Sequence, residues 1–299
     1  MKSLTCTSRN SCGFTLLELL VAMSLTSLLM AIVISAVLQL RNHYFTDIKR
    51  TQVNGNLRSA MDIMSMNVRQ AGENLLAAFP AVLLTNGSSG ASDTLRLRRS
   101  PMTEVLTLCG DTASGSTQLF VSSASLSNTE CVPANVAPVF TIFTGQVESS
   151  EGTPRVFIYD KSVKAGEFVD YEGNGTDNGQ YFLTLGSTTR AYTQLNTSIY
   201  LIEEYQFTQN AVSNRLELTV NQDGSARPVA FDVTDFQVQF TLQDGAVVDA
   251  FDQMSTTDWK DVHQIQLTLS GRSEFRGQEI ASTISSNYFP RNVLSYEGG

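Results

Sequence analysis

The longest apolar run in the chain lies near its start. It extends from Phe14 to Leu40 and contains a single charged residue in 27, Glu18. Because a helix needs about 20 apolar residues to cross the hydrocarbon of a bilayer, this run predicts a transmembrane helix over residues 14–40. The run is too long for the apolar part of an ordinary secretory signal, and no small-residue cleavage site follows it. Residues 1–13 are polar and weakly basic, so we expect any cleavage to fall before the apolar run.

The helical pattern continues beyond the apolar run, but only on one side of the helix. Apolar residues recur there at steps of three and four, which places them on one face: Leu57, Ala60, Met61, Met64 and Val68. Residues 41–79 are therefore predicted to form the soluble half of the same helix and its end, with Gly72 as the C-terminal cap. A helix from Phe14 to near Ala71 would be about 85 Å long, at about 1.5 Å per residue.

Residues 80–299 change to short apolar runs separated by Ser, Thr, Asn, Gln and Gly, a pattern typical of β-strands and turns. In the segment VTDFQVQFTL apolar and polar residues alternate, which predicts a strand with one buried face. The tripeptide QDG at 222–224 and again at 243–245 predicts two turns. The predicted strands are Thr94–Arg98, Thr117–Ser122, Val139–Thr144, Arg155–Tyr159, Tyr181–Leu185, Ser198–Tyr205, Arg215–Val220, Phe231–Leu242 and His263–Leu269. The expected fold class is α+β: a long N-terminal α-helix, transmembrane in its first half, packed against an antiparallel β-sheet head.

The formal net charge of −9 excludes one class of function. Bulk binding to nucleic acid needs clustered Lys and Arg to displace counterions from phosphates, and the chain is acidic. Its one short basic cluster is Arg96, Arg98 and Arg99. We interpret these residues as a solvated or ion-paired strand and not as a binding site.

The four cysteines divide into two pairs. Cys6 and Cys12 precede the apolar run, whereas Cys109 and Cys131 lie in the head. In an oxidising compartment, a disulfide between Cys109 and Cys131 would close a loop of roughly 20 residues and contribute about 3 kcal/mol. The alternative is two buried free thiols.

The residues needed for a metal site or a catalytic centre are sparse. The chain has no CxxC motif, no GxSxG elbow, no phosphate-binding loop and two histidines, His43 and His263. One segment, VDYEGNGTDNG, offers oxygen ligands for calcium, but we favour a flexible turn over a site there: Asp170, Glu172, Asn174 and Asp177. We therefore expect a non-enzymatic protein without a metal or a cofactor.

The residues at the start of the apolar run, GFTLLE from Gly13 to Glu18, resemble the class III signal of type IV prepilins and type II secretion pseudopilins. The resemblance implies that a membrane prepilin peptidase cuts after Gly13 and methylates the new N-terminus, Phe14. It also implies a leader on the cytoplasmic side, a single pass through the inner membrane, and a head in the periplasm and later in the extracellular pilus.

A carboxylate within hydrocarbon costs about 2.5–3.5 kcal/mol, so Glu18 needs a partner. The resemblance implies that Glu18 pairs with the Phe14 amine of a neighbouring subunit during assembly. The alternative is a glutamate that reaches the membrane surface without a specific partner.

Further segments resemble the PilW and GspJ branch of this family. They are LRSAMDIMSMNVRQAG at 57–72, PVAFDVTDFQVQFTL, VHQIQLTLSGRS and the closing FPRNV at 289–293. The resemblance implies a minor pilin that assembles with other minor pilins and the major pilin into a priming or tip complex. A GspJ-like pseudopilin of a type II secretion system and a pilus-tip adhesin are the alternatives. Residues 80–195 match no pattern of this branch, and we expect them to determine individual specificity.

Overall fold

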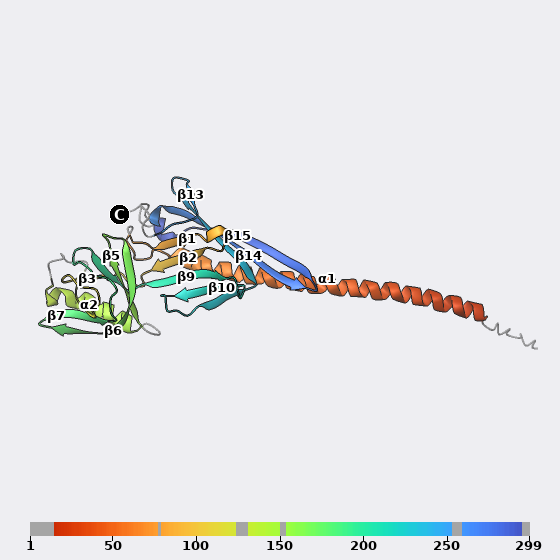
Figure 1. Ribbon diagram of the computed structural model, residues 1–299, viewed down its shortest axis with the longest axis horizontal. Coiled ribbons are helices and arrows are strands. Elements are labelled where there is room, and N and C mark those ends of the chain that lie inside the picture. Colours follow the sequence, from red (N-terminus) through yellow and green to blue (C-terminus); the bar gives the residue numbers. More distant parts are fainter. Residues whose placement is uncertain (1–14, 77–78, 124–130, 150–153, 253–258, 295–299) are drawn as a thin grey trace, which may run out of the picture.

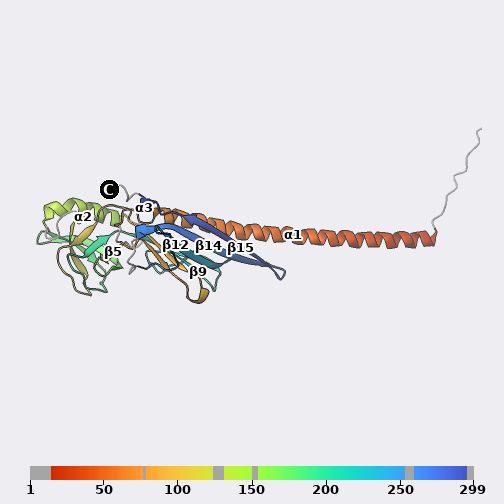
Figure 2. The ribbon, with the colours of Figure 1, turned by 90° about the horizontal axis from the view of Figure 1, so that it is seen from above.

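The computed structural model describes residues 15–76, 79–123, 131–149, 154–252 and 259–294, and these form an elongated molecule (Figure 1). A single helix, α1 (Leu16–Gln70), projects from one end, and the strands gather around its C-terminal half. Figure 2 shows that the first half of α1 stays clear of the head in a second view as well. All residues from Leu16 to Leu40 are exposed. The long helix predicted from the sequence is confirmed.

The second half of α1 buries one stripe of apolar side chains against the strands. The stripe contains the five predicted residues and one more, Val53. The helix ends as expected: Ala71 is the C-cap residue, and Gly72 follows with a φ of 80°. Gly72, the predicted cap, thus lies one position past the C-cap. Its backbone conformation favours glycine and redirects the chain, and its N–H donates to the carbonyl of Arg98 at 2.8 Å.

Two antiparallel sheets share a hydrophobic core with α1. The first has the order β1-β2-β9-β10-β11, from β1 (Val82–Thr85), β2 (Thr94–Arg99), β9 (Glu203–Asn210), β10 (Arg215–Val220) and β11 (Arg227–Phe231). The second has the order β13-β12-β14-β15, from β12 (Val233–Leu242), β13 (Val247–Val248), β14 (Val262–Phe275) and β15 (Gln278–Tyr288). Leu57, Phe207, Phe236 and Trp259 belong to this shared core.

A closed barrel of six strands makes up the end of the molecule opposite the start of α1 (Figure 1). Its strands, in barrel order, are β3 (Leu106–Leu108), β4 (Gln118–Ser123), β7 (Gln180–Leu185), β6 (Ala165–Asp177), β5 (Arg155–Asp160) and β8 (Thr197–Tyr200). Helix α2 (Pro133–Glu148) packs on β4 and β7, and the barrel has a second core that includes Phe143, Ile158 and Leu183. Since β2 and β9 are neighbours in the first sheet, the barrel is an insertion between two adjacent strands.

Three short helical turns complete the part of the chain that the structure describes. They are η1 (Ser88–Gly90), η2 (Trp259–Asp261) and α3 (Arg291–Leu294). The predicted QDG turns connect β10 to β11 and β12 to β13, as expected.

Two sequence predictions for the head are wrong. The expected strand Val139–Thr144 lies within α2, where Val136, Phe140, Phe143 and Val147 are buried at steps of four and three, the spacing of one helix face. The expected strand Ser198–Tyr205 is divided between β8 and β9, which belong to different sheets.

The segment that offered oxygen ligands for calcium, and for which we favoured a flexible turn, lies mostly in a strand. Its residues 169–177 lie in β6, and the turn falls at Asn178 and Gly179, which have φ values of 46° and 82°. These two residues close a tight hairpin to β7, in which Asp177 pairs with Gln180.

Candidate functional site

The N-terminal end of α1 contains the first group of predicted site residues. Gly13 and Phe14 lie outside the described residues, so the predicted cleavage and methylation site stays a prediction. Thr15 is the N-cap of α1, and its hydroxyl oxygen accepts the N–H of Glu18 at 3.2 Å. In return the carboxylate of Glu18 accepts the N–H of Thr15 at 3.1 Å. Glu18 therefore caps its own helix in this chain.

This reciprocal pair is a capping box, and the sequence contains its signal. Thr15 is followed three residues later by Glu18, at the start of an apolar run. The predicted role of Glu18 was to pair with a neighbouring subunit. Its local role as a helix cap was not predicted. The predicted intersubunit role would use the same carboxylate, and it stays a prediction.

None of the described residues covers the apolar half of α1. Leu16 is 79% exposed and Leu40 is 71% exposed, and the exposed surface between them is predominantly apolar, with Glu18 and a few Ser, Thr and Gln side chains. Among the described residues, α1 is the one helix long and apolar enough to cross a membrane. Such a surface needs lipid or the helices of other subunits around it.

The other end of α1 is closed by residues from the C-terminus of the chain. The side-chain amide of Asn292 donates to the carbonyl of Ala71 at 3.0 Å and to that of Gln70 at 3.3 Å. These carbonyls have no partner within the helix, and the amide satisfies them. Asn292 belongs to the FPRNV segment, so this segment acts as a cap for the helix in this chain.

A buried ion pair lies where the barrel joins the first sheet. Arg98 on β2 donates to Glu204 on β9 at 2.6 Å, and the guanidinium also lies over the ring of Phe157 on β5 at 4.9 Å. Phe79 packs against the same barrel face, with its ring 5.0 Å from that of Tyr200. Burial lowers the pKa of Arg98, although the charge of Glu204 acts against this shift.

The other two arginines of the basic cluster are also paired across the β2–β9 strands. Arg96 donates to Gln206 at 2.6 Å, and Arg99 donates to Glu203 at 2.7 Å. Burial by itself would lower the pKa of Arg99, but the hydrogen bond and charge of Glu203 outweigh burial and raise that pKa. Two of the three arginines are ion-paired and the third donates to a neutral amide, so the interpretation of this cluster as a solvated or ion-paired strand agrees with the structure.

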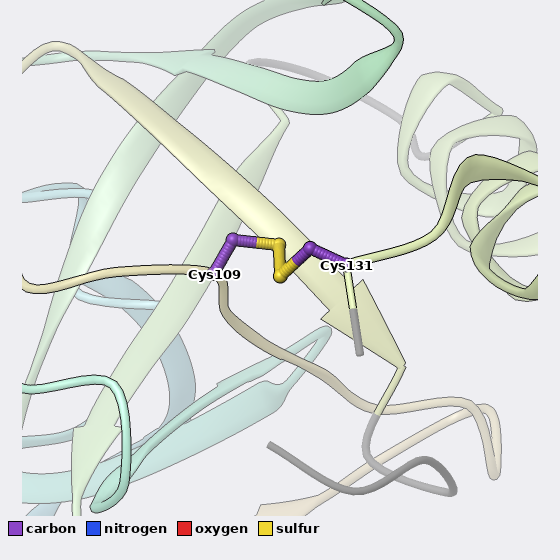
Figure 3. The surroundings of a disulfide bond; sticks show 2 residues. All are labelled: Cys109 and Cys131. Carbon is purple, nitrogen blue, oxygen red and sulfur yellow. A yellow bond between two sulfur atoms is a disulfide. The ribbon is translucent and has the colours of Figure 1, made fainter. Parts of the chain in front are cut away.

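Within the barrel, Cys109 and Cys131 form a disulfide bond (Figure 3). The bridge joins the segment after β3 to the segment just before α2, across 22 positions of sequence. The backbone N–H of Cys109 also donates to Phe120 on β4 at 2.8 Å. The bridge therefore ties the start of α2 to the barrel wall.

The carboxylate of Glu167 holds the loop between β7 and β8 by hydrogen bonds. Glu167 on β6 accepts the hydroxyl of Tyr192 at 2.8 Å and the hydroxyl of Thr189 at 2.6 Å. Burial acts to raise the pKa of Glu167, but the hydrogen bonds from Thr189 and Tyr192 outweigh it and lower that pKa. Burial and the bond to Glu167 together raise the pKa of the Tyr192 phenol.

Two of the four possible calcium ligands, Asp170 and Asn174, contact structural partners. Asp170 pairs with Arg155 at 2.8 Å, and Asn174 donates to Glu148 on α2 at 2.8 Å. Across the described parts of the chain, no three side chains of His, Cys, Asp or Glu gather closely enough to hold a metal ion.

Comparison with known proteins adds one match. Residues 8–34 fit the family model described as the prokaryotic N-terminal methylation motif. No curated protein and no solved structure matches the chain.

The fold and the motif define the class of this protein. It has a long, apolar N-terminal helix followed by antiparallel sheets, which is the layout of a pilin-like α+β protein. The motif indicates a type IV pilin-like protein, and it implies processing by a prepilin peptidase and assembly with pilins. Proteins with this motif are generally structural and not enzymatic, and the apolar helix fits anchoring in the inner membrane.

Proposed function

We propose that this chain is a minor pilin of the PilW and GspJ-like branch, which assembles with other minor pilins into a priming or tip complex of a type IV pilus. Its role is non-enzymatic. Residues 1–13 are a leader removed by prepilin peptidase, Phe14 is the methylated N-terminus, and residues 14–40 cross the inner membrane. Residues 41–79 are the soluble half of the N-terminal helix and its end, and the head, residues 80–299, lies in the periplasm before it enters the extracellular pilus.

The position of the barrel carries this proposal. The barrel occupies the end of the molecule farthest from the membrane helix (Figure 2). In a fibre whose subunits stack along their N-terminal helices, the space beyond each head belongs to the subunit above it. A barrel of six strands projecting into that space obstructs stacking at every position except the top. This favours a subunit present in few copies at the tip. The sequence of the inserted residues 106–200 is then free to differ from one kind of subunit to another.

The charge at the start of α1 supports an assembly role. The N-terminal amine created at Phe14 would lie within one helical turn of Glu18, and an ammonium is the natural partner for a carboxylate in hydrocarbon. Pairing of Glu18 with the Phe14 amine of a neighbouring subunit would set the stagger between adjacent helices. The leucines, valines and isoleucines that face lipid before assembly would then pack against other helices.

The first experiment determines where the chain is cleaved and whether its new N-terminus is methylated. Intact mass and N-terminal sequence are measured for the protein from its native membrane, for a Gly13→Ala variant, and for cells without prepilin peptidase. We expect the native chain to begin at N-methylated Phe14. This N-terminus should be absent in both controls. A chain that keeps Met1 in its native membrane would contradict the proposal.

The second experiment separates a pilus from a secretion system. Cells without this chain are scored for the number of surface pili and for export of folded enzymes, and sheared pili are probed with an antibody to the barrel. We expect fewer pili, intact export and labelling at fibre ends. Normal pili with lost export would instead identify a GspJ-like pseudopilin, and labelling along the whole shaft would exclude the tip position.

A further inference from the structure

The hairpin β14–β15 reaches along α1 farther toward the membrane end than any other part of the described head (Figure 1). Its tip docks on the helix. The ring of Phe275 lies 5.5 Å from that of Phe45, and the guanidinium of Arg276 donates to the side-chain oxygen of Asn42 at 2.9 Å. The tip is therefore held at one level of α1.

That level is the end of the apolar run. From Leu19 to Leu40 the helix contains 22 residues, or about 33 Å at about 1.5 Å per residue, close to the roughly 30 Å of hydrocarbon in a bilayer. Before assembly, with Glu18 capping its own helix at one membrane surface, Leu40 lies at the other. Asn42 and Phe45 then lie about 3 Å and 8 Å beyond the hydrocarbon, within a headgroup layer about 5–8 Å thick. The hairpin tip lies at the same height.

The residues at this level have the composition of a membrane surface belt. Arg41 lies over the ring of Phe45 at 5.6 Å, Arg276 lies over the ring of Phe275 at 5.6 Å, and Tyr44 is 62% exposed. Aromatic rings and arginines whose stems lie on apolar surface are enriched where protein meets headgroups.

The charges directly behind the tip are of both signs. Arg50 pairs with Asp47 at 3.9 Å, and Arg272 pairs with Glu279 at 3.6 Å, whereas Glu274 is exposed on β14. Arg41 and Arg276 make no ion pair among the described residues. The two cations nearest to the apolar run are thus available to an anion, in a chain whose formal net charge is −9.

We propose that Arg41, Tyr44, Phe45, Phe275 and Arg276 form a collar that binds anionic phospholipid headgroups on the head side of the membrane. The collar fixes the depth of α1 and presents the head at a set height before the subunit enters an assembly. This inference rests on the membrane anchoring in the proposed function. It adds a second point of membrane contact, which the β14–β15 hairpin provides.

The test uses the full chain with Cys6→Ser and Cys12→Ser, so that an added cysteine can be labelled while Cys109 and Cys131 stay bridged. A fluorophore is placed at Gln278→Cys, at the exposed hairpin tip, or at Ser213→Cys, at the exposed turn between β9 and β10. The second site is a matched control, because this end of the first sheet contacts α1 at Asn56, about 24 Å beyond Leu40 at about 1.5 Å per residue.

The chain is reconstituted in phosphatidylcholine vesicles with or without phosphatidylglycerol, and quenching by brominated lipid is measured. We expect several-fold stronger quenching at 278 than at 213, and a further increase with phosphatidylglycerol. Arg41→Gln with Arg276→Gln should abolish that increase. Arg215→Gln should preserve it, although Arg215 also lies over an aromatic ring, that of Phe231 at 4.9 Å.

Flotation of the vesicles distinguishes the proposed collar from membrane anchoring by α1. A chain that floats with the vesicles but shows equal quenching at both positions, or no response to phosphatidylglycerol, would overturn the collar and leave anchoring by α1 intact. A chain that does not float would overturn anchoring itself and the collar with it. Equal thermal unfolding of the arginine variants and the parent would show that their heads are folded.

Discussion

The guanidinium of Arg98 and the carboxylate of Glu204 lie 2.6 Å apart with their side chains only 3% and 1% exposed. Their strands, β2 and β9, are the ones from which the barrel leaves the first sheet and to which it returns. Arg98 also donates to the carbonyl of Pro80 at 3.1 Å. The pair thus joins the root of the inserted barrel to the core around α1.

Loss of the charge on one partner of this pair should lower the free energy of unfolding considerably. Glu204→Gln leaves the Arg98 charge buried without a counter-ion, and we expect the free energy of unfolding to fall by about 3–5 kcal/mol. Glu279→Gln is the matched control, because its partner Arg272 is 54% exposed, and it should cost no more than about 1 kcal/mol. Urea unfolding in detergent measures both, and equal effects would contradict this account.

Two glycines of the N-terminal region should respond to alanine in opposite directions. A Cβ at Gly72 would lie 2.0 Å from the ring of Trp259, at a φ of 80°, so Gly72→Ala should destabilise the head by about 2 kcal/mol or more. Gly55 has open space around it within α1, and Gly55→Ala should stabilise by about 0.5–1 kcal/mol. Trp259 fluorescence during unfolding measures both changes. A harmless Gly72→Ala would show that Trp259 does not pack there.

The sequence predicted α1 well because its signals are local and repeated. The apolar run and the stripe from Leu57 to Val68 each extend over several helical turns. The strand β15 was missed because its apolar residues are few: Ile280 and Ile284 stand among Ser, Thr and Asn on an edge strand. The error at Val139–Thr144 has a similar origin, since β-branched and aromatic residues favour a strand locally while the burial pattern extends over a longer helix.

The barrel and the buried pair could not be predicted, because they depend on contacts distant in sequence. Closure requires β3 to pair with β8, with Leu106 opposite Ile199. Arg98 meets Glu204 only because β9 returns beside β2 after the whole insertion. By contrast, the Thr15–Glu18 capping box lies within four residues, and its spacing in the sequence is sufficient to predict it.

Glu167 should make the stability of the barrel depend on pH in acid. Its pKa is lowered from the usual 4.5 in the folded state, so the folded protein binds the proton more weakly than the unfolded chain. Its contribution is therefore fully present above the unfolded pKa, and it is lost as pH falls through the folded pKa. We expect Glu167→Gln to be less stable than the parent at neutral pH and to lose this difference in acid.

Thermal unfolding at several pH values measures this dependence. Glu217→Gln is the control, because Glu217 is a strand carboxylate of the first sheet that accepts a hydrogen bond from Asn210. A Glu167→Gln deficit that stays constant down to the most acidic pH would contradict the assigned role of the ionised carboxylate.

The disulfide should stabilise the barrel more than the rest of the head. Replacing Cys109 and Cys131 together by Ser should lower the free energy of unfolding by about 3 kcal/mol, because the unfolded chain loses a closed loop. The barrel has its own hydrophobic core, so hydrogen exchange should accelerate in β3, β4 and α2 and stay slow in β12 and β14. A reducing agent should reproduce the effect in the parent and change nothing in the double variant. Uniform acceleration through the head would contradict separate cores.

The two roles of Glu18 can be separated by a substitution that keeps one of them. Glutamine also serves at this position of a capping box, so Glu18→Gln preserves the hydrogen bond to the N–H of Thr15 but removes the charge. Thr15→Ala does the reverse, because it removes the cap hydroxyl and keeps the carboxylate. If Glu18 pairs with the Phe14 amine of a neighbour, Glu18→Gln should abolish incorporation into pili while Thr15→Ala largely preserves it. The measurement is the amount of each variant in sheared pili relative to the membrane. Normal incorporation of Glu18→Gln would leave the helix cap as the whole role of this residue, and the intersubunit pair would have to be abandoned.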